Sequence, residues 1–147
     1  MQIDRRKFLE TTCRACLLAG AGILLTELTA CGPTSKVTQL PVSLNSVRLP
    51  ITSFATEQLQ IVRPEGWLYN IAVRKIGDNQ YETLLLQCTH QQNQLIMNPN
   101  GFQCTLHGSL FNTEGQVLKG PAEFPLKRFP TTVDQGQVII QLKSLNA

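Results

Sequence analysis

Residues 88–111 read CTHQQNQLIMNPNGFQCTLHGSLF, and this stretch decides how the rest of the chain is interpreted. It contains a C-x-H box, Cys88 to His90, and a C-x-x-H box, Cys104 to His107, with thirteen residues between them. The chain has only two histidines, so each of them lies at metal-ligand spacing from a cysteine. Two thiolates and two imidazoles suit either a tetrahedral zinc ion or an iron–sulfur cluster.

Short apolar runs between turn signals surround the two boxes and predict an all-β domain. No sustained 3.6-residue apolar stripe occurs in this part of the chain, and turns rich in Gly, Asn and Pro separate the runs. Each box falls where a predicted strand ends in a loop, so two loop tips could meet at a metal. The expected strands cover residues 47–51, 59–62, 67–75, 81–87, 95–97, 110–112, 117–119 and 138–142.

The two boxes resemble the ligand motifs of Rieske iron–sulfur proteins, and the second continues in the same way as His107-Gly108-Ser109-Leu110-Phe111. Gly115 falls in the expected tight turn, and GPAEFPL at residues 120–126 resembles the proline-rich loop that covers the cluster in quinol-oxidising Rieske subunits. The resemblance extends over roughly residues 81–142. It implies a Rieske-type antiparallel β-sandwich with a small cluster-binding subdomain of two loops.

The resemblance also implies the cofactor, a Rieske-type [2Fe-2S] cluster. Cys88 and Cys104 would bind one iron, and His90 and His107 would bind the other. Ser109 would hydrogen-bond a bridging sulfide. Such a chain is an electron-transfer subunit rather than a catalyst on its own, although it could form part of a quinol oxidoreductase.

Several positions depart from the quinol-oxidising pattern. Asn93 and Leu106 stand where those subunits carry two extra cysteines that form a disulfide, and Phe111 replaces a tyrosine whose hydroxyl donates to a ligand sulfur. Gln91 and Gln92 make the loop tip polar. With fewer donors to the sulfurs, we expect a reduction potential of about 0 to +200 mV, below the upper end of the Rieske range of about −150 to +300 mV.

The first thirty-one residues have the features of an export signal. An arginine pair, Arg5 and Arg6, precedes an uncharged stretch over residues 15–26, which resembles a twin-arginine signal. As a helix this stretch would be about 18 Å long, too short for a bilayer core of about 30 Å. After Glu27 the chain continues with LTACG at residues 28–32, which looks like a lipobox with Cys31 as the lipidated residue. An uncleaved signal anchor is the alternative.

These features predict three segments: a signal peptide over residues 1–30, the lipidated Cys31 with a flexible linker over residues 31–45, and a Rieske domain over residues 46–147. The mature protein would be a membrane-anchored lipoprotein facing the periplasm or the cell exterior. The net charge of +3, without a basic stripe interleaved with aromatic residues, gives no sign of a nucleic-acid partner.

The predicted function is that of an exported, membrane-tethered electron carrier in a respiratory quinol-oxidising complex. Its redox partner would be a cytochrome or a quinol-oxidising membrane subunit. The alternatives are a small Rieske subunit of an exported molybdenum oxidoreductase, a stand-alone carrier, and a structural zinc module. A Rieske oxygenase needs further histidines for mononuclear iron, and both histidines of this chain are already used.

Overall fold

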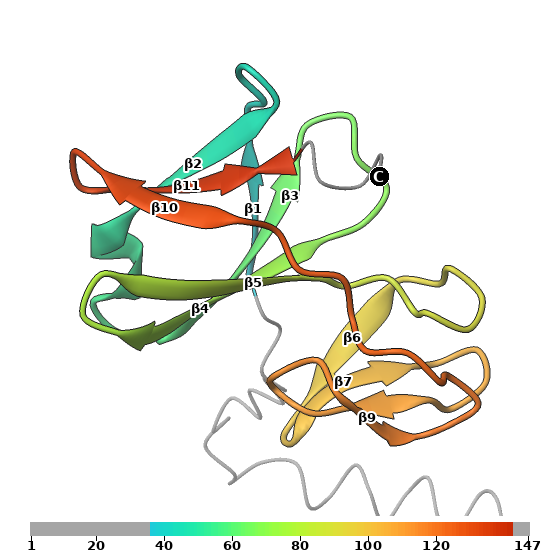
Figure 1. Cartoon of the computed structure of the whole chain (residues 1–147). Coiled ribbons are helices and arrows are strands. Elements are labelled where there is room, and N and C mark those ends of the chain that lie inside the picture. The colour runs from blue at the N-terminus through green and yellow to red at the C-terminus, as the bar shows by residue number, and fades with distance from the viewer. Residues whose placement is uncertain (1–35, 143–147) are drawn as a thin grey trace, which may run out of the picture. The chain divides into compact units, whose positions relative to one another are not determined.

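A four-stranded sheet in the order β1-β3-β4-β5 occupies the middle of the fold (Figure 1). The computed structural model describes residues 36–142, and all structural statements below concern this part of the chain. Within the sheet β1 runs parallel to β3, while the other neighbours are antiparallel. The strands are β1 (Val37–Leu40), β3 (Leu59–Pro64), β4 (Ile71–Gly77) and β5 (Gln80–Leu85).

A three-stranded antiparallel sheet in the order β10-β11-β2 packs on one face of the central sheet. This sheet brings together segments from the two ends of the described chain, because β2 pairs with the central strand β11 along its whole length, from Ser46 to Pro50. A single 3-10 turn, η1 (Ile51–Phe54), follows β2. The strands are β2 (Ser46–Pro50), β10 (Thr131–Asp134) and β11 (Gln137–Gln141).

A second four-stranded antiparallel sheet, in the order β6-β7-β8-β9, packs on the other face of the central sheet. Figure 1 shows it on the side of β4 and β5 opposite to β10 and β11. This sheet carries the segment with the two Cys/His boxes. The strands are β6 (Leu95–Asn98), β7 (Gly101–Cys104), β8 (Leu110–Phe111) and β9 (Val117–Lys119).

The central sheet is buried on both faces because successive side chains of a strand point to opposite sides. Ile71, Val73 and Leu85 belong to the core shared with the three-stranded sheet. Ala72 and Leu84 belong to the core shared with β6–β9. All five are at most 3% exposed. The near-continuous apolar runs of β4 and β5 therefore reflect two cores rather than one.

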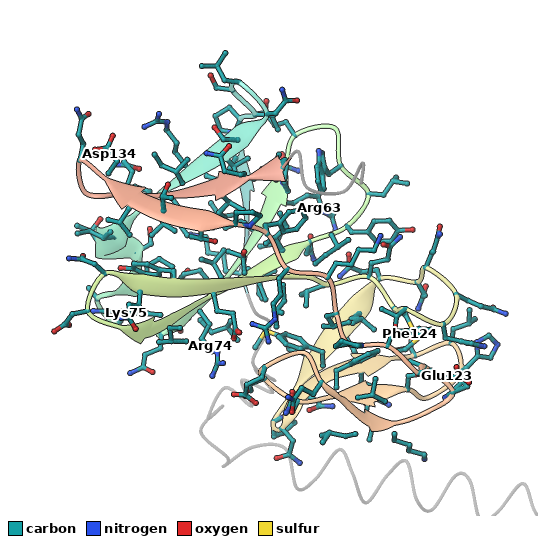
Figure 2. The ribbon with its side chains drawn as sticks, in the orientation of Figure 1. Arg63, Arg74, Lys75, Glu123, Phe124 and Asp134 are labelled. Carbon is teal, nitrogen blue, oxygen red and sulfur yellow. The ribbon has the colours of Figure 1, made fainter. Side chains whose placement is uncertain are left out.

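A charged network joins the central sheet to the turn between β8 and β9. Arg74 on β4 pairs with Glu82 on β5 at 2.6 Å and with Glu114 in that turn at 2.9 Å. Arg128 also pairs with Glu82, and it donates to the Glu114 carbonyl oxygen at 2.6 Å. Figure 2 shows Arg74 projecting from β4 on the side away from β10. The network therefore connects the sheet of β6–β9 to the central sheet.

The all-β prediction is confirmed, and eight of the observed strands overlap the expected ones. Three strands were not expected: β1, β7 and β10. The expected strand at residues 67–75 begins too early, because Trp67 donates to the carbonyl oxygen of Pro64 in a turn and β4 starts only at Ile71. The sandwich is also not purely antiparallel, because β1 pairs with β3 in parallel.

The expected flexible linker over residues 31–45 is wrong for residues 37–40, which form β1. The four residues of β1 pair with residues 61–64 of β3, so their hydrogen bonds come from a partner distant in the sequence. The sequence of β1, VTQL, contains only two apolar side chains and no apolar run, so the sequence alone does not mark it as a strand. The signal peptide and the lipidation site at Cys31 lie outside the described residues. Among residues 36–142, no helix has the length and apolar character needed to cross a membrane.

Candidate metal centre

Two loops at one end of the sheet of β6–β9 carry the four candidate ligands. The first loop, residues 86–94, connects β5 to β6 and contains Cys88 and His90. Its ends are held together by backbone hydrogen bonds from Leu95 N to Leu86 O at 2.9 Å and from Cys88 N to Asn93 O at 2.8 Å. The loop therefore folds back on itself immediately after its first ligand.

The second loop, residues 105–109, connects β7 to β8 and contains His107. Cys104 ends β7, and its N–H donates to the carbonyl oxygen of Ser109 at 2.9 Å. Its own carbonyl oxygen accepts from Gly108 N at 3.0 Å. Gly108 adopts a positive φ of 77°, which glycine reaches without a steric penalty. The second loop is thus closed by bonds between residues at most five positions apart.

The four candidate ligands differ sharply in exposure. Cys88 and Cys104 are each only 1% exposed and are part of the core beneath the loops. His90 and His107 are exposed at the surface. The site therefore has a buried sulfur end and an exposed imidazole end.

The candidate ligands also come together as two pairs. Both cysteines are free thiols, and Cys88 lies within hydrogen-bonding reach of Cys104. The rings of His90 and His107 meet edge to face, with centroids 5.0 Å apart and planes at 79°. Within residues 36–142, no three or more His, Cys, Asp or Glu side chains converge on one point. A two-iron cluster with two cysteines at one end and two histidines at the other fits such a paired donor set.

The surroundings of Cys104 favour negative charge on its sulfur. Burial raises the pKa of the Cys104 thiol, but hydrogen bonds from the backbone N–H groups of His107 and Leu106 and from the Cys88 and Asn93 side chains lower that pKa below its ordinary value. The Asn93 amide nitrogen lies 3.7 Å from the Cys104 sulfur. A thiolate is the form of cysteine that binds metal, so these donors suit a ligand.

Ser109, the last residue of the second loop, is fully buried. Its hydroxyl oxygen accepts a hydrogen bond from Ala122 N at 3.0 Å, which leaves the hydroxyl hydrogen for another acceptor. Ala122 belongs to the proline loop, residues 120–130, which connects β9 to β10. Figure 2 shows Glu123 and Phe124 of this loop beside the sheet of β6–β9.

Three residues that support the first loop were not identified from the sequence. The Tyr69 hydroxyl donates to the Gln92 carbonyl oxygen at 2.6 Å, and the Thr89 hydroxyl donates to the Phe124 carbonyl oxygen at 2.7 Å. The Asn70 N–H donates to the side-chain oxygen of Gln94 at 2.9 Å. The partners of these bonds lie 23, 35 and 24 residues apart, and no local pattern signals them. The first loop is therefore held by distant segments.

Comparison with known proteins places this arrangement in a family. The sequence pattern of the Rieske [2Fe-2S] domain matches residues 51–130, which is more than half of the chain. The chain is 28% identical over 125 residues to the cytochrome b6-f complex iron-sulfur subunit 1 of Synechocystis sp., covering 83% of this chain and 63% of that protein. It is 37% identical over 59 residues to subunit 3 of the same complex from Nostoc sp., covering 39% of this chain and 33% of that one. The chain spans less than two thirds of the length of these relatives.

Solved structures share the fold. The crystal structure of the plasma membrane Rieske protein from Synechocystis matches with a TM-score of 0.50 and 23% identity, over 62% of this chain and 93% of that one. A chain from the complex of oxygenase and ferredoxin in carbazole 1,9a-dioxygenase matches with a TM-score of 0.50 and 22% identity, over 68% of this chain and 95% of that one. The match to the Rieske sequence pattern over residues 51–130, together with the paired cysteines and histidines, shows that the chain belongs to the Rieske [2Fe-2S] family and that its cofactor is a Rieske-type [2Fe-2S] cluster.

Proposed function

We propose that this protein is a one-electron carrier in which Cys88 and Cys104 bind one iron of the cluster and His90 and His107 bind the other. A bound Rieske cluster supplies one-electron redox chemistry. The observation that carries the proposal is the pairing of two buried thiols beneath two exposed imidazoles. This arrangement insulates one end of the site and leaves the other open to a partner.

The surrounding residues have distinct tasks in this proposal. The exposed ring edges of His90 and His107 are the points at which a partner's cofactor approaches. The buried cysteines keep water away from the sulfur end. Ser109, with its oxygen bound by Ala122 N, has a hydroxyl hydrogen to offer to a bridging sulfide. Hydrogen bonds to the sulfurs are among the features that set the potential of an iron–sulfur site.

A membrane complex that oxidises quinol is the partner that the surface around the histidines supports best. Leu106, next to His107, is 57% exposed, and Phe124, whose carbonyl oxygen binds Thr89, is 67% exposed. Such exposed apolar side chains suit docking against an apolar pocket. The similarity to cytochrome b6-f iron-sulfur subunits points the same way. Co-purification with a protein containing haem b, after mild detergent extraction of membranes, would support this assembly.

A second candidate is the small Rieske subunit of an exported molybdenum oxidoreductase, or a stand-alone carrier. The observation that favours it is the exposed pair Gln91 and Gln92 at the tip of the first loop, which makes that side of the surface polar. Purification with a molybdenum-containing subunit, and without haem b, would favour the first of these alternatives. Isolation as a monomer from the same membranes would favour the carrier.

Export and tethering through a lipid on Cys31 complete the proposal. Two sequence features support this part of the proposal: the arginine pair, Arg5 and Arg6, and the lipobox-like residues 28–32. The full chain should fractionate with membranes, and mass spectrometry should find an acylated Cys31 as the first residue of the mature protein. Replacement of Cys31 by Ser should release the protein from the membrane. Retention of the intact N-terminus in the membrane by the Cys31→Ser variant would instead indicate an uncleaved anchor.

The test of the electron-transfer proposal is metal analysis with a redox titration followed by EPR. The purified protein should contain two irons and two sulfides per chain, as a [2Fe-2S] cluster requires. A Rieske-type EPR signal should develop on reduction, with a midpoint of about 0 to +200 mV. Stoichiometric zinc without iron would refute the electron-transfer function and leave a structural module.

A further inference from the structure

Asn93 lies in the first loop and contacts both candidate cysteine ligands. Its carbonyl oxygen accepts from Cys88 N at 2.8 Å, which closes the first loop behind that ligand. Its side-chain nitrogen lies 3.7 Å from the Cys104 sulfur at the base of the second loop. The same nitrogen lies 3.3 Å from the carbonyl oxygen of Gln94, which orients the amide. One residue thus holds one ligand by its backbone and contacts the other by its side chain.

The contact with sulfur has an electrostatic consequence. A ligand sulfur carries more negative charge after the site accepts an electron than before. A positive N–H dipole directed at that sulfur therefore stabilises the reduced state more than the oxidised state. The Asn93 side chain is half-buried, so water screens this dipole less than it would at an exposed position.

Other side chains near Cys104 are poorly suited to this task. Leu106 is apolar and 57% exposed, and Phe111 is buried but has no donor. The backbone N–H groups of Leu106 and His107 also donate to the Cys104 sulfur. A side-chain substitution does not remove these backbone donors. Apart from Cys88, which is itself a candidate ligand, Asn93 is thus the side chain through which substitution can change the hydrogen bonding of the Cys104 sulfur.

We infer that Asn93 is a positioning residue that links the two cluster loops and raises the reduction potential by donating its side-chain amide to the Cys104 sulfur. The inference rests on the proposed role of Cys104 as an iron ligand. It assigns to Asn93 a task in tuning electron transfer beyond the closure of its own loop.

The test compares midpoint potentials of full-length variants by EPR-monitored redox titration. Asn93→Leu keeps a similar volume and removes the donor, and Asn93→Asp removes the donor and places a carboxylate beside the sulfur. Both variants should retain the Rieske signal, and both midpoints should be lower than that of the wild type, with the Asp variant lowest. If the Leu variant does not retain its cluster, Asn93→Ala, which also removes the donor without adding a charge, takes its place in the comparison.

Tyr69→Phe is the matched control, because it removes the hydrogen bond to Gln92 in the same loop without touching the sulfur. It should lower the temperature at which the cluster is lost and leave the midpoint unchanged. Wild-type midpoints in both Asn93 variants would overturn the inference while leaving the proposed function intact. A Tyr69→Phe midpoint as low as that of Asn93→Leu would overturn it too, since loop position would then set the potential. Absence of any Rieske signal from the wild-type chain would instead refute the proposed function.

Discussion

The two loops that carry the candidate ligands reach the same site by different means. The second loop is short and is closed by its own backbone bonds between Cys104, Gly108 and Ser109. The first loop is longer, and its tip is held by Tyr69 from the segment before β4 and through Thr89 by the proline loop. The backbone bonds of the second loop are all local, whereas the first loop, whose ends are also joined by backbone bonds, is held in addition by distant segments.

The difference matters because the departures from the quinol-oxidising pattern affect both loops. Asn93 and Leu106 stand at the positions where a cross-loop disulfide would be expected. In this protein the polar contact of Asn93 with the Cys104 sulfur joins the two loops. Hydrogen bonds from distant segments, such as that of Tyr69, position the first loop. Each of these non-covalent bonds contributes about 1 kcal/mol, less than a typical disulfide. The first loop should therefore be the weaker half of the site.

Removal of a ligand should have the largest effect. Cys104→Ala deletes a thiol that both loops share through hydrogen bonds, and we expect complete loss of iron from the purified protein. Thr105→Val is the control, because Thr105 is the exposed neighbour of this ligand. It should retain a wild-type iron content. Full iron content in Cys104→Ala would remove Cys104 from the ligand set.

Gly101→Ala should have the next largest effect, through the strand that leads into the second loop. Gly101 begins β7 with φ +140°, and an added Cβ would lie 2.2 Å from the Phe111 carbonyl oxygen on β8. The backbones of β7 and β8 are hydrogen-bonded neighbours, so they cannot separate to make room for the added Cβ without losing these bonds. We therefore expect a loss of about 3 kcal/mol or more in the free energy of unfolding. Denaturant titration measures this value.

Gly136→Ala is the matched control for the backbone conformation. Gly136 also has a positive φ, of +72°, but an added Cβ would meet nothing within 4 Å. Only the strain of the left-handed conformation remains, about 1 kcal/mol. Equal losses in the two variants would show that the close approach of β7 to β8 contributes nothing.

Thr89→Val should have a smaller effect, confined to the first loop. The substitution keeps the shape of the side chain and removes the hydroxyl that donates to Phe124 O. We expect a loss of about 1 kcal/mol and faster release of the cluster at elevated temperature, followed by absorbance. Thr105→Val makes the same change in the second loop and should leave the release rate as it is. Equal rates in the two variants would contradict the proposed weakness of the first loop.

The pH dependence of Glu114 should give the smallest effect. The Thr113 hydroxyl and the nearby Arg74 guanidinium hold the pKa of the Glu114 carboxyl below its ordinary value of 4.5. A pKa that is lower in the folded state means that this carboxylate stabilises the fold fully above about pH 4.5, and that its contribution is lost as the pH falls further. Glu114→Gln should therefore reduce stability at pH 7 and approach the wild type in acid. A constant difference between the two proteins across this range would contradict the assignment.

The second loop and most of the strands could be predicted from the sequence, because short stretches of sequence mark them. Ligand, glycine and serine follow one another between Cys104 and Ser109, and alternating apolar residues mark the longer strands. The strands that were missed, β1, β7 and β10, read VTQL, GFQC and TTVD, with no two adjacent apolar side chains, and pairing with neighbouring strands completes them. For such strands tertiary pairing outweighs local preference.

The supports of the first loop could not be predicted for a related reason. Tyr69 and Thr89 act through hydrogen bonds to carbonyl groups 23 and 35 residues away, and any residue could supply those carbonyls. From the sequence, Asn93 is identified only as the residue that replaces an expected cysteine. The sequence does not indicate which atom its side-chain amide contacts. Its contact with the Cys104 sulfur depends on how the fold places the two loops, which no local sequence pattern specifies.

If two exposed histidines and two buried cysteines hold one cluster, pulsed EPR of the reduced protein will detect the histidines on the iron. We expect hyperfine couplings from two imidazole nitrogens, one of which should disappear in each of the ligand variants His90→Cys and His107→Cys where a cluster is retained. Two nitrogen couplings in the wild type would place both histidines on the iron. A [2Fe-2S] signal without nitrogen couplings would show that the histidines do not bind the cluster, and a protein that binds zinc in place of iron would show that no such cluster forms.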